Sequence, residues 1–233
     1  GAGPYAAEIS VGKAVAKLVA AHPRLKVQVV TDGPEQIRHG LVTRQIDVGI
    51  FESGLSHKDD PLHAEPLPTH ILCLFCRPGH PLTRVAQLTV AGILAYPLVT
   101  TLVRGDRAAV VMAAGIAAGR AVTAGTGRQT GDFEPAIHVN TLAIATQIAS
   151  ESDAIYPGPL VATGAALKAK QLVQLDFRIP ALQTCYSVNY LRDRSRSPAA
   201  SAFIDALHQV EASLKALERT MESRASRKRA PAT

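Results

Sequence analysis

The stretch from Leu25 to Phe51, LKVQVVTDGPEQIRHGLVTRQIDVGIF, decides the fold class. Its first six residues alternate in polarity and then become apolar, which predicts a strand over Leu25–Val30. A turn at Thr31-Asp32-Gly33-Pro34 leads into a predicted helix over Glu35–Thr43. Ile46–Phe51 predicts a second short strand, apolar enough to be buried on both faces. A strand, a helix and a strand with short connections predict a parallel pair joined by a right-handed crossover.

Strand and helix patterns alternate on both sides of this unit. Pro4–Ala21 carries apolar residues at helical spacing and ends before Pro23, so it predicts a helix. Further strands are predicted over residues 62–67, 71–77, 96–101, 135–139, 153–156, 172–177 and 184–191. Further helices are predicted over residues 88–94, 106–119, 140–150 and 198–224, and Pro157-Gly158-Pro159 predicts a turn. The chain is therefore predicted to be α/β, with two lobes that each contain an open, mostly parallel sheet.

The composition excludes several classes of protein. The chain has 233 residues, of which 47% are hydrophobic and 19% charged, so it is long and apolar enough to bury a core. Its apolar runs fall short of the roughly 18 residues that a membrane span needs. Aromatic residues are 4% and Trp is missing, which disfavours a surface that stacks nucleic-acid bases.

The net charge of +6 is concentrated at the end of the chain. Residues 192–233 contain nine Lys or Arg and five Asp or Glu, a net charge of +4, and the rest of the chain is nearly neutral. The most basic stretch, Arg224–Arg229, is followed by Ala230-Pro231-Ala232-Thr233 and is predicted to be solvated. A DNA-docking element is therefore not predicted in these residues.

No catalytic or metal-binding set is evident. Cys73 and Cys76 form a C-x-x-C, but positions three apart on a strand point to opposite faces, so both are predicted to be structural. The eight His residues have no metal-motif spacing, and no Ser, His and Asp set can be nominated. The chain is therefore predicted to be neither an enzyme nor a cofactor-binding or metal-binding protein.

Predicted strand ends and helix starts carry a set of small polar or conformationally special residues. The N–H groups at helix starts favour an anion, and Thr and Asn side chains can orient one. Singly, each residue has a simpler structural role, such as Asn140 capping a helix. The predicted effector-binding residues are Pro4, Tyr5, Gly33, Pro34, Phe51, Thr100, Thr101, Asn140, Thr141, Tyr156 and Pro157.

Four phrases, in order along the chain, resemble the effector-sensing domain of LysR-type transcriptional regulators. Gly33 and Leu41 precede Gln45–Ile50 (QIDVGI), which resembles the family's "L-D-x-x-I" segment. The most specific phrase is Arg77–Leu82 (RPGHPL), which resembles "R-x-x-H-P-L". The remaining two are Leu88 through Tyr96–Val99 (YPLV), and Ser197–Ala200 (SPAA) with Phe203-Ile204.

This resemblance implies a fold like that of type 2 periplasmic binding proteins, with a small metabolite between two lobes. Lobe I would comprise residues 1–76 and 186–233, and lobe II residues 77–185, with hinges near Phe75–Arg77 and Cys185–Ser187. The family's pocket positions correspond to all the residues named above except Phe51 and Thr141. Glu151-Ser152-Asp153 lacks two glycines that are frequent in the family, which suggests a specialised ligand.

The resemblance also implies partners. These are a small-molecule effector, which we expect to be a carboxylate, and a second copy of the chain in a homodimer, or a tetramer in the full-length protein. DNA would be bound only through an N-terminal winged helix-turn-helix that precedes this domain in the family, and no membrane contact is expected. The expected location is the cytoplasm. The alternative is an exported solute-binding protein of the same fold, which serves an uptake system.

Overall fold

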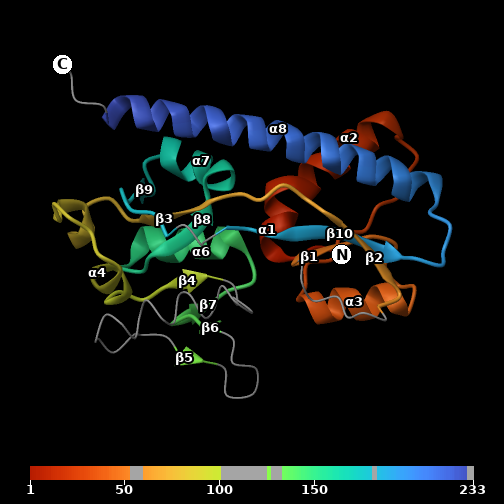
Figure 1. Cartoon of the computed structure of the whole chain (residues 1–233), viewed down its shortest axis with the longest axis horizontal. Coiled ribbons are helices and arrows are strands. Elements are labelled where there is room, and N and C mark those ends of the chain that lie inside the picture. The colour runs from red at the N-terminus through yellow and green to blue at the C-terminus, as the bar shows by residue number, and fades with distance from the viewer. Residues whose placement is uncertain (53–59, 101–124, 127–132, 180–182, 230–233) are drawn as a thin grey trace. The chain divides into compact units, whose positions relative to one another are not determined.

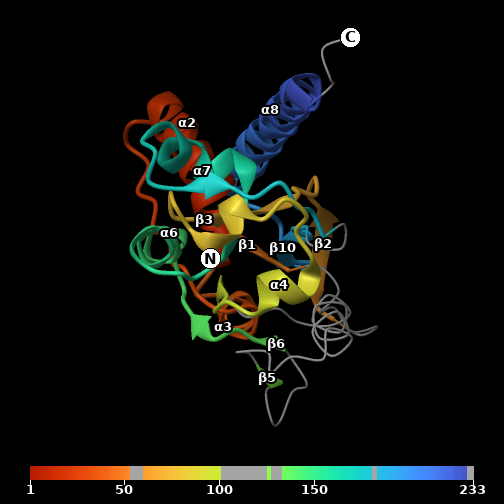
Figure 2. The ribbon, with the colours of Figure 1, turned by 90° about the vertical axis from the view of Figure 1, so that its left-hand side faces the viewer.

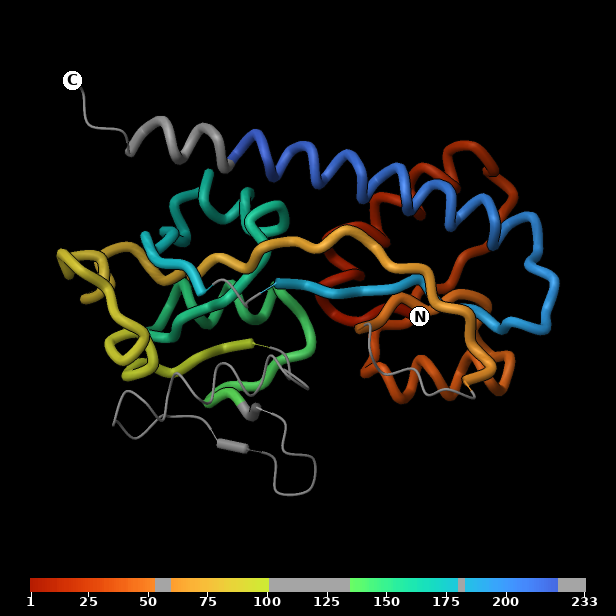
Figure 3. The backbone as a smooth tube through the Cα atoms, in the orientation of Figure 1, coloured from red at the N-terminus to blue at the C-terminus, as the bar shows by residue number. Residues whose placement is uncertain are grey.

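The computed structural model describes residues 1–52, 60–100, 125–126, 133–179 and 183–229. The chain forms two compact units. The first comprises residues 1–70 and 184–233, and the second residues 71–183. Figures 1 and 3 show the course of the chain, which passes from the first unit to the second after residue 70 and returns at residue 184. The predicted lobe boundaries differ, since residues 71–76 lie in the second unit and residues 184–185 in the first.

The first unit opens with a continuous helical run, as Pro4–Ala21 predicts. It consists of α1 (Pro4–Ala6), a π-helical segment η1 (Ala7–Val11) and α2 (Gly12–Ala21). The run ends at His22, whose backbone leaves the helical region immediately before Pro23. Its buried face packs along the terminal helix α8 (Pro198–Arg229), as Figure 1 shows.

The first unit's three-stranded sheet has the order β1-β10-β2, with antiparallel neighbours. The strands are β1 (Gly49–Glu52), β2 (Leu62–Pro66) and β10 (Tyr186–Leu191). Helix α3 (Pro34–Val42) covers β1 through a buried cluster of Ile37, Leu41, Phe51 and Leu62. The predicted parallel pairing occurs at Ala2, which bridges Thr31 on one side and Ile50 on the other.

The predicted strand over Leu25–Val30 is wrong as an assignment. The segment is extended, but it forms no ladder, and its pairing begins only at Thr31. Val27, Val29 and Val30 are 40%, 47% and 38% exposed, although they would be buried in a paired central strand. The strand neighbour of this segment is Ala2, and the hydrogen bonds between the two begin only at Val30, whose carbonyl accepts the Ala2 N–H.

The second unit is built around β3 (Leu72–Cys76), which lies between β8 (Tyr156–Pro159) and β9 (Val173–Gln174). Both neighbours are antiparallel to it. A parallel pair, β4 (Val99–Thr100) and β7 (Ile137–His138), and an antiparallel pair, β5 (Gly125–Thr126) and β6 (Phe133–Glu134), complete the strands. The two-unit α/β fold is confirmed. In each three-stranded sheet, however, the central strand, β10 or β3, runs antiparallel to both of its neighbours.

Among the described residues of the second unit, four helical segments pack around these strands. They are η2 (Pro81–Arg84), α4 (Val90–Leu94), α6 (Leu142–Glu151) and α7 (Leu160–Lys168). Figure 2 shows α4, α6 and α7 around β3. The core includes Leu74, Cys76, Ile93, Leu98 and Ile155. The helix predicted over residues 106–119 lies outside the described residues.

In the second unit one local prediction is wrong and one helix was not predicted. Pro157-Gly158-Pro159 is not a turn but most of β8, an edge strand of its sheet, where prolines with no N–H are tolerated. Gly158 is needed there, since a Cβ would overlap the ring of Tyr156. Helix α7, which directly follows, was not predicted, because its apolar residues show little helical periodicity.

A buried charge cluster fixes α8 to the rest of the first unit. His70 Nε2 lies 2.8 Å from Glu211 Oε2, and His70 Nδ1 lies 3.5 Å from Glu218 Oε2. Lys215 Nζ lies 2.6 Å from Glu218 Oε2 and donates to the Thr69 carbonyl. Burial alone would lower the pKa of His70, but the hydrogen bond to Glu211 and the charges of both glutamates raise it to about 9. His70 is therefore an imidazolium at neutral pH, and the cluster joins α8 to the end of the chain segment that leaves this unit.

Candidate functional site

Three segments of the first unit run side by side in parallel and lead to one edge. Ala2 N–H donates to the Val30 carbonyl at 2.8 Å, and Gly3 N–H donates to the Ile50 carbonyl at 2.8 Å. The predicted residues Pro4, Tyr5, Gly33, Pro34 and Phe51 follow these three segments directly. The structure therefore brings the first-unit members of the predicted set to the same edge.

Two helices start at this edge, each after a glycine. Gly3 precedes Pro4 at the start of α1, and Gly33 precedes Pro34 at the start of α3. Both glycines have extended backbone angles and provide no side-chain cap. Helix starts concentrate partial positive charge from aligned N–H groups, so this edge favours a negatively charged group.

Phe51 contributes to the edge in a different way from its neighbours. Its side chain is 3% exposed and packs in the core with Ile37, Leu41 and Leu62. Tyr5 is also largely buried, at 6% exposure. The main contribution of Phe51 to any ligand contact would therefore come from its backbone.

The second unit has an equivalent edge. Val99 pairs with Ile137 and Thr100 with His138 in parallel, and Leu98 bridges Ile155 in parallel. These three neighbouring segments lead to Thr100, to Asn140 with Thr141, and to Tyr156 with Pro157. Thr101 lies outside the described residues. The second-unit members that the structure describes thus lie at the ends of adjacent segments.

Helix α6 begins at this second edge, one residue later than predicted. Thr141, not Asn140, is the cap, since its Oγ1 accepts the Ile144 N–H at 3.2 Å. Asn140 is exposed. Its amide is therefore not used as the helix cap, which the sequence could not distinguish because Asn and Thr are both good caps.

The phrase Arg77–Leu82 has a structural role in the second unit. His80 is fully buried, and its Nδ1 accepts the Leu82 N–H at 3.1 Å, which caps η2. Its ring meets Tyr96 edge-on, with ring centroids 4.5 Å apart. Arg77 pairs with Asp153 at 2.7 Å. The motif therefore fixes the loop after β3.

The C-x-x-C pair is structural as well. Cys73 and Cys76 are both buried in β3, and Cys76 belongs to the core cluster of the second unit. Burial raises the pKa of the Cys76 thiol to about 11, so it stays protonated at neutral pH. Among the described residues, no group of three or more His, Cys, Asp or Glu could hold a metal ion.

None of the described helices is both long and apolar enough to cross a membrane.

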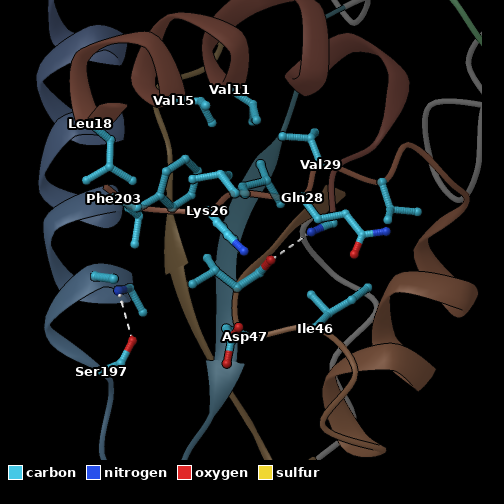
Figure 4. Close-up of a pocket in the computed structure, with 18 of the residues that line it drawn as sticks. Val11, Val15, Leu18, Lys26, Gln28, Val29, Ile46, Asp47, Ser197 and Phe203 are labelled. Atoms are coloured by element: carbon cyan, nitrogen blue, oxygen red, sulfur yellow. Dashed lines mark hydrogen bonds between the residues drawn. The ribbon is translucent and has the colours of Figure 1, made fainter. Parts of the chain in front are cut away.

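The first unit also contains a cavity of about 320 Å³ that the sequence did not predict (Figure 4). Residues 25–30 form one wall and residues 45–48 the other. Val11, Val15, Leu18 and Phe203 cover it from the helical side. Gly1 lies at its end, so the cavity extends from the amino end of the Gly1–Gly3 segment, opposite to the edge that carries Pro4 and Pro34. It is therefore separate from the predicted effector-binding residues.

The charge cluster was also missed, although the sequence carried a signal for it. Glu211 and Glu218 are seven residues apart, so they share a helical face with Leu207 and Leu214, which are buried. Two carboxylates on an apolar face need a buried cation. Nothing in the sequence points to His70, which lies 141 residues away from Glu211.

Comparison with known proteins places these observations in a family. The sequence model described as LysR substrate binding domain matches residues 1–212. A curated relative is the SDS degradation transcriptional activation protein of Pseudomonas sp. (strain ATCC 19151), which is 28% identical over 206 residues. That match covers 87% of this chain and 63% of the relative. The chain thus spans less than two thirds of the length of that relative.

Solved structures share the fold at low sequence identity. The regulatory domain of MetR, a LysR family regulator from N. meningitidis, gives a TM-score of 0.66 at 13% identity, covering 91% of this chain and 92% of that one. The effector domain of the regulator AmpR from Pseudomonas aeruginosa gives 0.65 at 18% identity, covering 94% and 96%. These likenesses support the two-unit α/β fold.

Proposed function

Because the chain belongs to the LysR substrate binding domain family, we propose that this effector-sensing domain recognises a small organic anion through the two edges described above. The observation that carries the proposal is the set of structural features that the two edges share. Each edge combines the ends of adjacent parallel segments with at least one helix start. Family membership also means that the chain is a sensor of a small molecule and not an enzyme.

The chemistry of the edges favours an anion with a hydrogen-bonding head group. The starts of α1, α3 and α6 supply aligned backbone dipoles, and Thr100 and Asn140 supply polar side chains. A carboxylate matches these donors, and so does a sulfate. The relative's name concerns SDS degradation, so short alkyl sulfates belong in the ligand panel beside carboxylates.

We propose that the effector acts by shifting populations in the whole regulator. A ligand that binds one conformation better than another moves the equilibrium by its difference in affinity. In the full-length protein this shift would change the arrangement of DNA-binding parts in a homodimer, or in a tetramer, located in the cytoplasm. The alternative of an exported solute-binding protein is favoured by none of the comparisons above.

Thermal unfolding with a panel of carboxylates and short alkyl sulfates tests the proposal. A ligand that binds only the native state raises its stability by about 2.7 kcal/mol at a hundredfold excess over the dissociation constant. We expect at least one anion to raise the unfolding midpoint, and its neutral amide or alcohol analogue to have no effect. If only neutral analogues raise the midpoint, the anion proposal is wrong.

The substitution Thr100→Val is expected to weaken binding of the active anion by roughly 10-fold to 100-fold, the loss of one hydrogen bond to a charged group. The change conserves shape at a buried position. Isothermal titration calorimetry measures the affinity. The matched control is Thr163→Val in α7, a buried position outside the predicted effector-binding residues, whose Oγ1 donates to the Pro159 carbonyl at the end of β8. Equal loss of affinity in both variants would contradict a direct role for Thr100.

A further inference from the structure

We propose that the π-helical segment η1 is a conformational joint, a locally weak part of the first helical run (residues 4–21) that lets α1 open and move without unfolding α2. Helix α1 carries Pro4 and Tyr5 of the predicted effector-binding set, so the joint lies directly beside the first edge. The joint acts in the free chain. Its test therefore needs no effector and is separate from the test of the anion proposal.

The hydrogen bonding of η1 departs from that of an α-helix. Gly12 N–H donates to the Ala7 carbonyl, five residues back, whereas an α-helix bonds four residues back. Ala7 N–H still donates to the Gly3 carbonyl at 2.9 Å, so the α-helical pattern holds until η1 begins. The run therefore contains one residue more than an α-helix with the same number of turns.

The sequence pattern explains why an unbroken α-helix does not form here. At about 3.6 residues per turn, Ile9 would share a helical face with Lys13 and Ala16. Those two residues are exposed, whereas Ile9 is only 2% exposed. The extra residue turns the part of the run before it by about 100°, which brings Ile9 to the buried side and leaves Glu8 exposed.

Ser10 is the residue that the wider turn accommodates. Ile9, Ser10 and Val11 are all buried, although an α-helix would spread three consecutive residues over about 200° of its circumference. Ser10 Oγ donates to the Ala6 carbonyl at 3.5 Å, which is long for a hydrogen bond. Without Ser10, Ala6 and Ile9 would lie on the same side of an unbroken α-helix as Leu18, which is also buried. The buried side of the run therefore does not depend on the π turn once this residue is removed.

The residues that follow η1 are consistent with a weak segment. Lys13 Nζ donates to the Ile9 carbonyl at 2.9 Å, so a side chain supplements the backbone bonding. Gly12 is exposed, and among the described residues a Cβ there would meet nothing nearer than the Ala7 carbonyl oxygen at 3.7 Å. Packing therefore does not require a glycine at this position. A glycine inside a helix lowers the stability of that helix, which favours local opening.

The two ends of the run are held by different parts of the first unit. At its start, Gly3 N–H donates to the Ile50 carbonyl at 2.8 Å, so α1 follows directly from a segment bonded to β1. Helix α2 packs along α8 instead, as Figure 1 shows. A weak segment between two anchored ends is where a displacement of one end relative to the other is absorbed. The joint therefore lets the start of α1 shift while α2 stays packed on α8.

Deletion of Ser10 tests the joint, because the shortened run can wind as an unbroken α-helix. We expect the thermal midpoint of this variant to lie within about 2 °C of the parent chain, or above it. In the parent chain, the amides of Ile9, Val11 and Gly12 should be at least about 10-fold less protected from hydrogen exchange than those of residues 14–17. Deleting Ser10 should slow their exchange by about 10-fold.

The matched control is deletion of Ala7, which also shortens the run by one residue. Winding as an α-helix would then expose Ile9, and a retained π turn would draw Tyr5 and Ala6 out of their buried positions. We expect the midpoint to fall by about 6 °C or more. An equal fall in both deletion variants would overturn the proposal. So would η1 amides that are as well protected as those of α2 in the parent chain, or whose exchange is unchanged by the loss of Ser10.

Discussion

Replacing His70 with alanine is expected to lower the free energy of unfolding by about 3–5 kcal/mol, the usual cost of removing one partner from a buried ion pair. His70 is 2% exposed, and Glu211 and Glu218 are 4% and 1% exposed. Lys215 still faces Glu218 in the variant, so Glu211 loses its cation completely. A buried carboxylate without a partner is far more costly than the cavity that the ring leaves. Urea unfolding followed by circular dichroism measures the loss.

Two further variants separate charge from packing. In the triple variant His70→Leu, Glu211→Met, Glu218→Met, all three charges are replaced by apolar side chains, so much of the stability should return. His22→Ala at an exposed histidine should change stability by less than about 0.5 kcal/mol. A loss below about 1 kcal/mol in His70→Ala, or a triple variant as unstable as the single one, would show that the cluster is not held by charge.

The position of His70 in the chain explains why its replacement is expected to destabilise the fold. Its backbone N–H donates to Thr184 Oγ1 at 2.9 Å, and Thr184 N–H donates to the His70 carbonyl at 2.8 Å. These are the two residues at which the chain leaves and re-enters the first unit. The cluster therefore joins α8 to both crossing segments at once.

The two predicted edges depend on local sequence patterns at helix starts, and these patterns are clear in this chain. Pro4 and Pro34 suit the first turn of a helix, and a glycine before each allows the extended entry. The alternation of strands and helices then places such starts at the ends of parallel segments. The arrangement of these residues within each unit could thus be predicted from the sequence.

What could not be predicted depends on contacts between distant residues. Leu25–Val30 has a strand pattern, yet pairing depends on a neighbour that is distant in the sequence, and the bonding to Ala2 begins only at Val30. Pro157-Gly158-Pro159 has the composition of a turn, but it pairs with β3 at the edge of a sheet. His70 gives no local sign of Glu211 and Glu218. In each case tertiary context, not propensity, decides the outcome.

The stability of the chain is expected to fall by about 3 kcal/mol as the pH rises from about 6.5 to about 9, because over this range the unfolded chain has lost the His70 proton and the folded protein still holds it. The pKa of His70 is about 9 in the folded protein and about 6.5 in an unfolded chain. A raised folded-state pKa contributes stability that is complete below about 6.5 and is lost progressively as the pH rises to about 9. The difference between the two pKa values, at 1.36 kcal/mol per unit, gives the magnitude.

Urea unfolding at several pH values between 6 and 10 measures this loss, with the triple variant at His70, Glu211 and Glu218 as the reference. Two other groups also change their charge within or close to this pH range. The Gly1 amine has a pKa lowered to about 6, so the stability rises with pH between about 6 and 8. The Cys76 thiol has a pKa raised to about 11, so the stability falls above pH 9. Both are present in the triple variant, so the difference between the two curves isolates the cluster. Parallel curves across this range would mean that His70 is neutral in the folded protein, and that the cluster is held by a hydrogen bond without a charge.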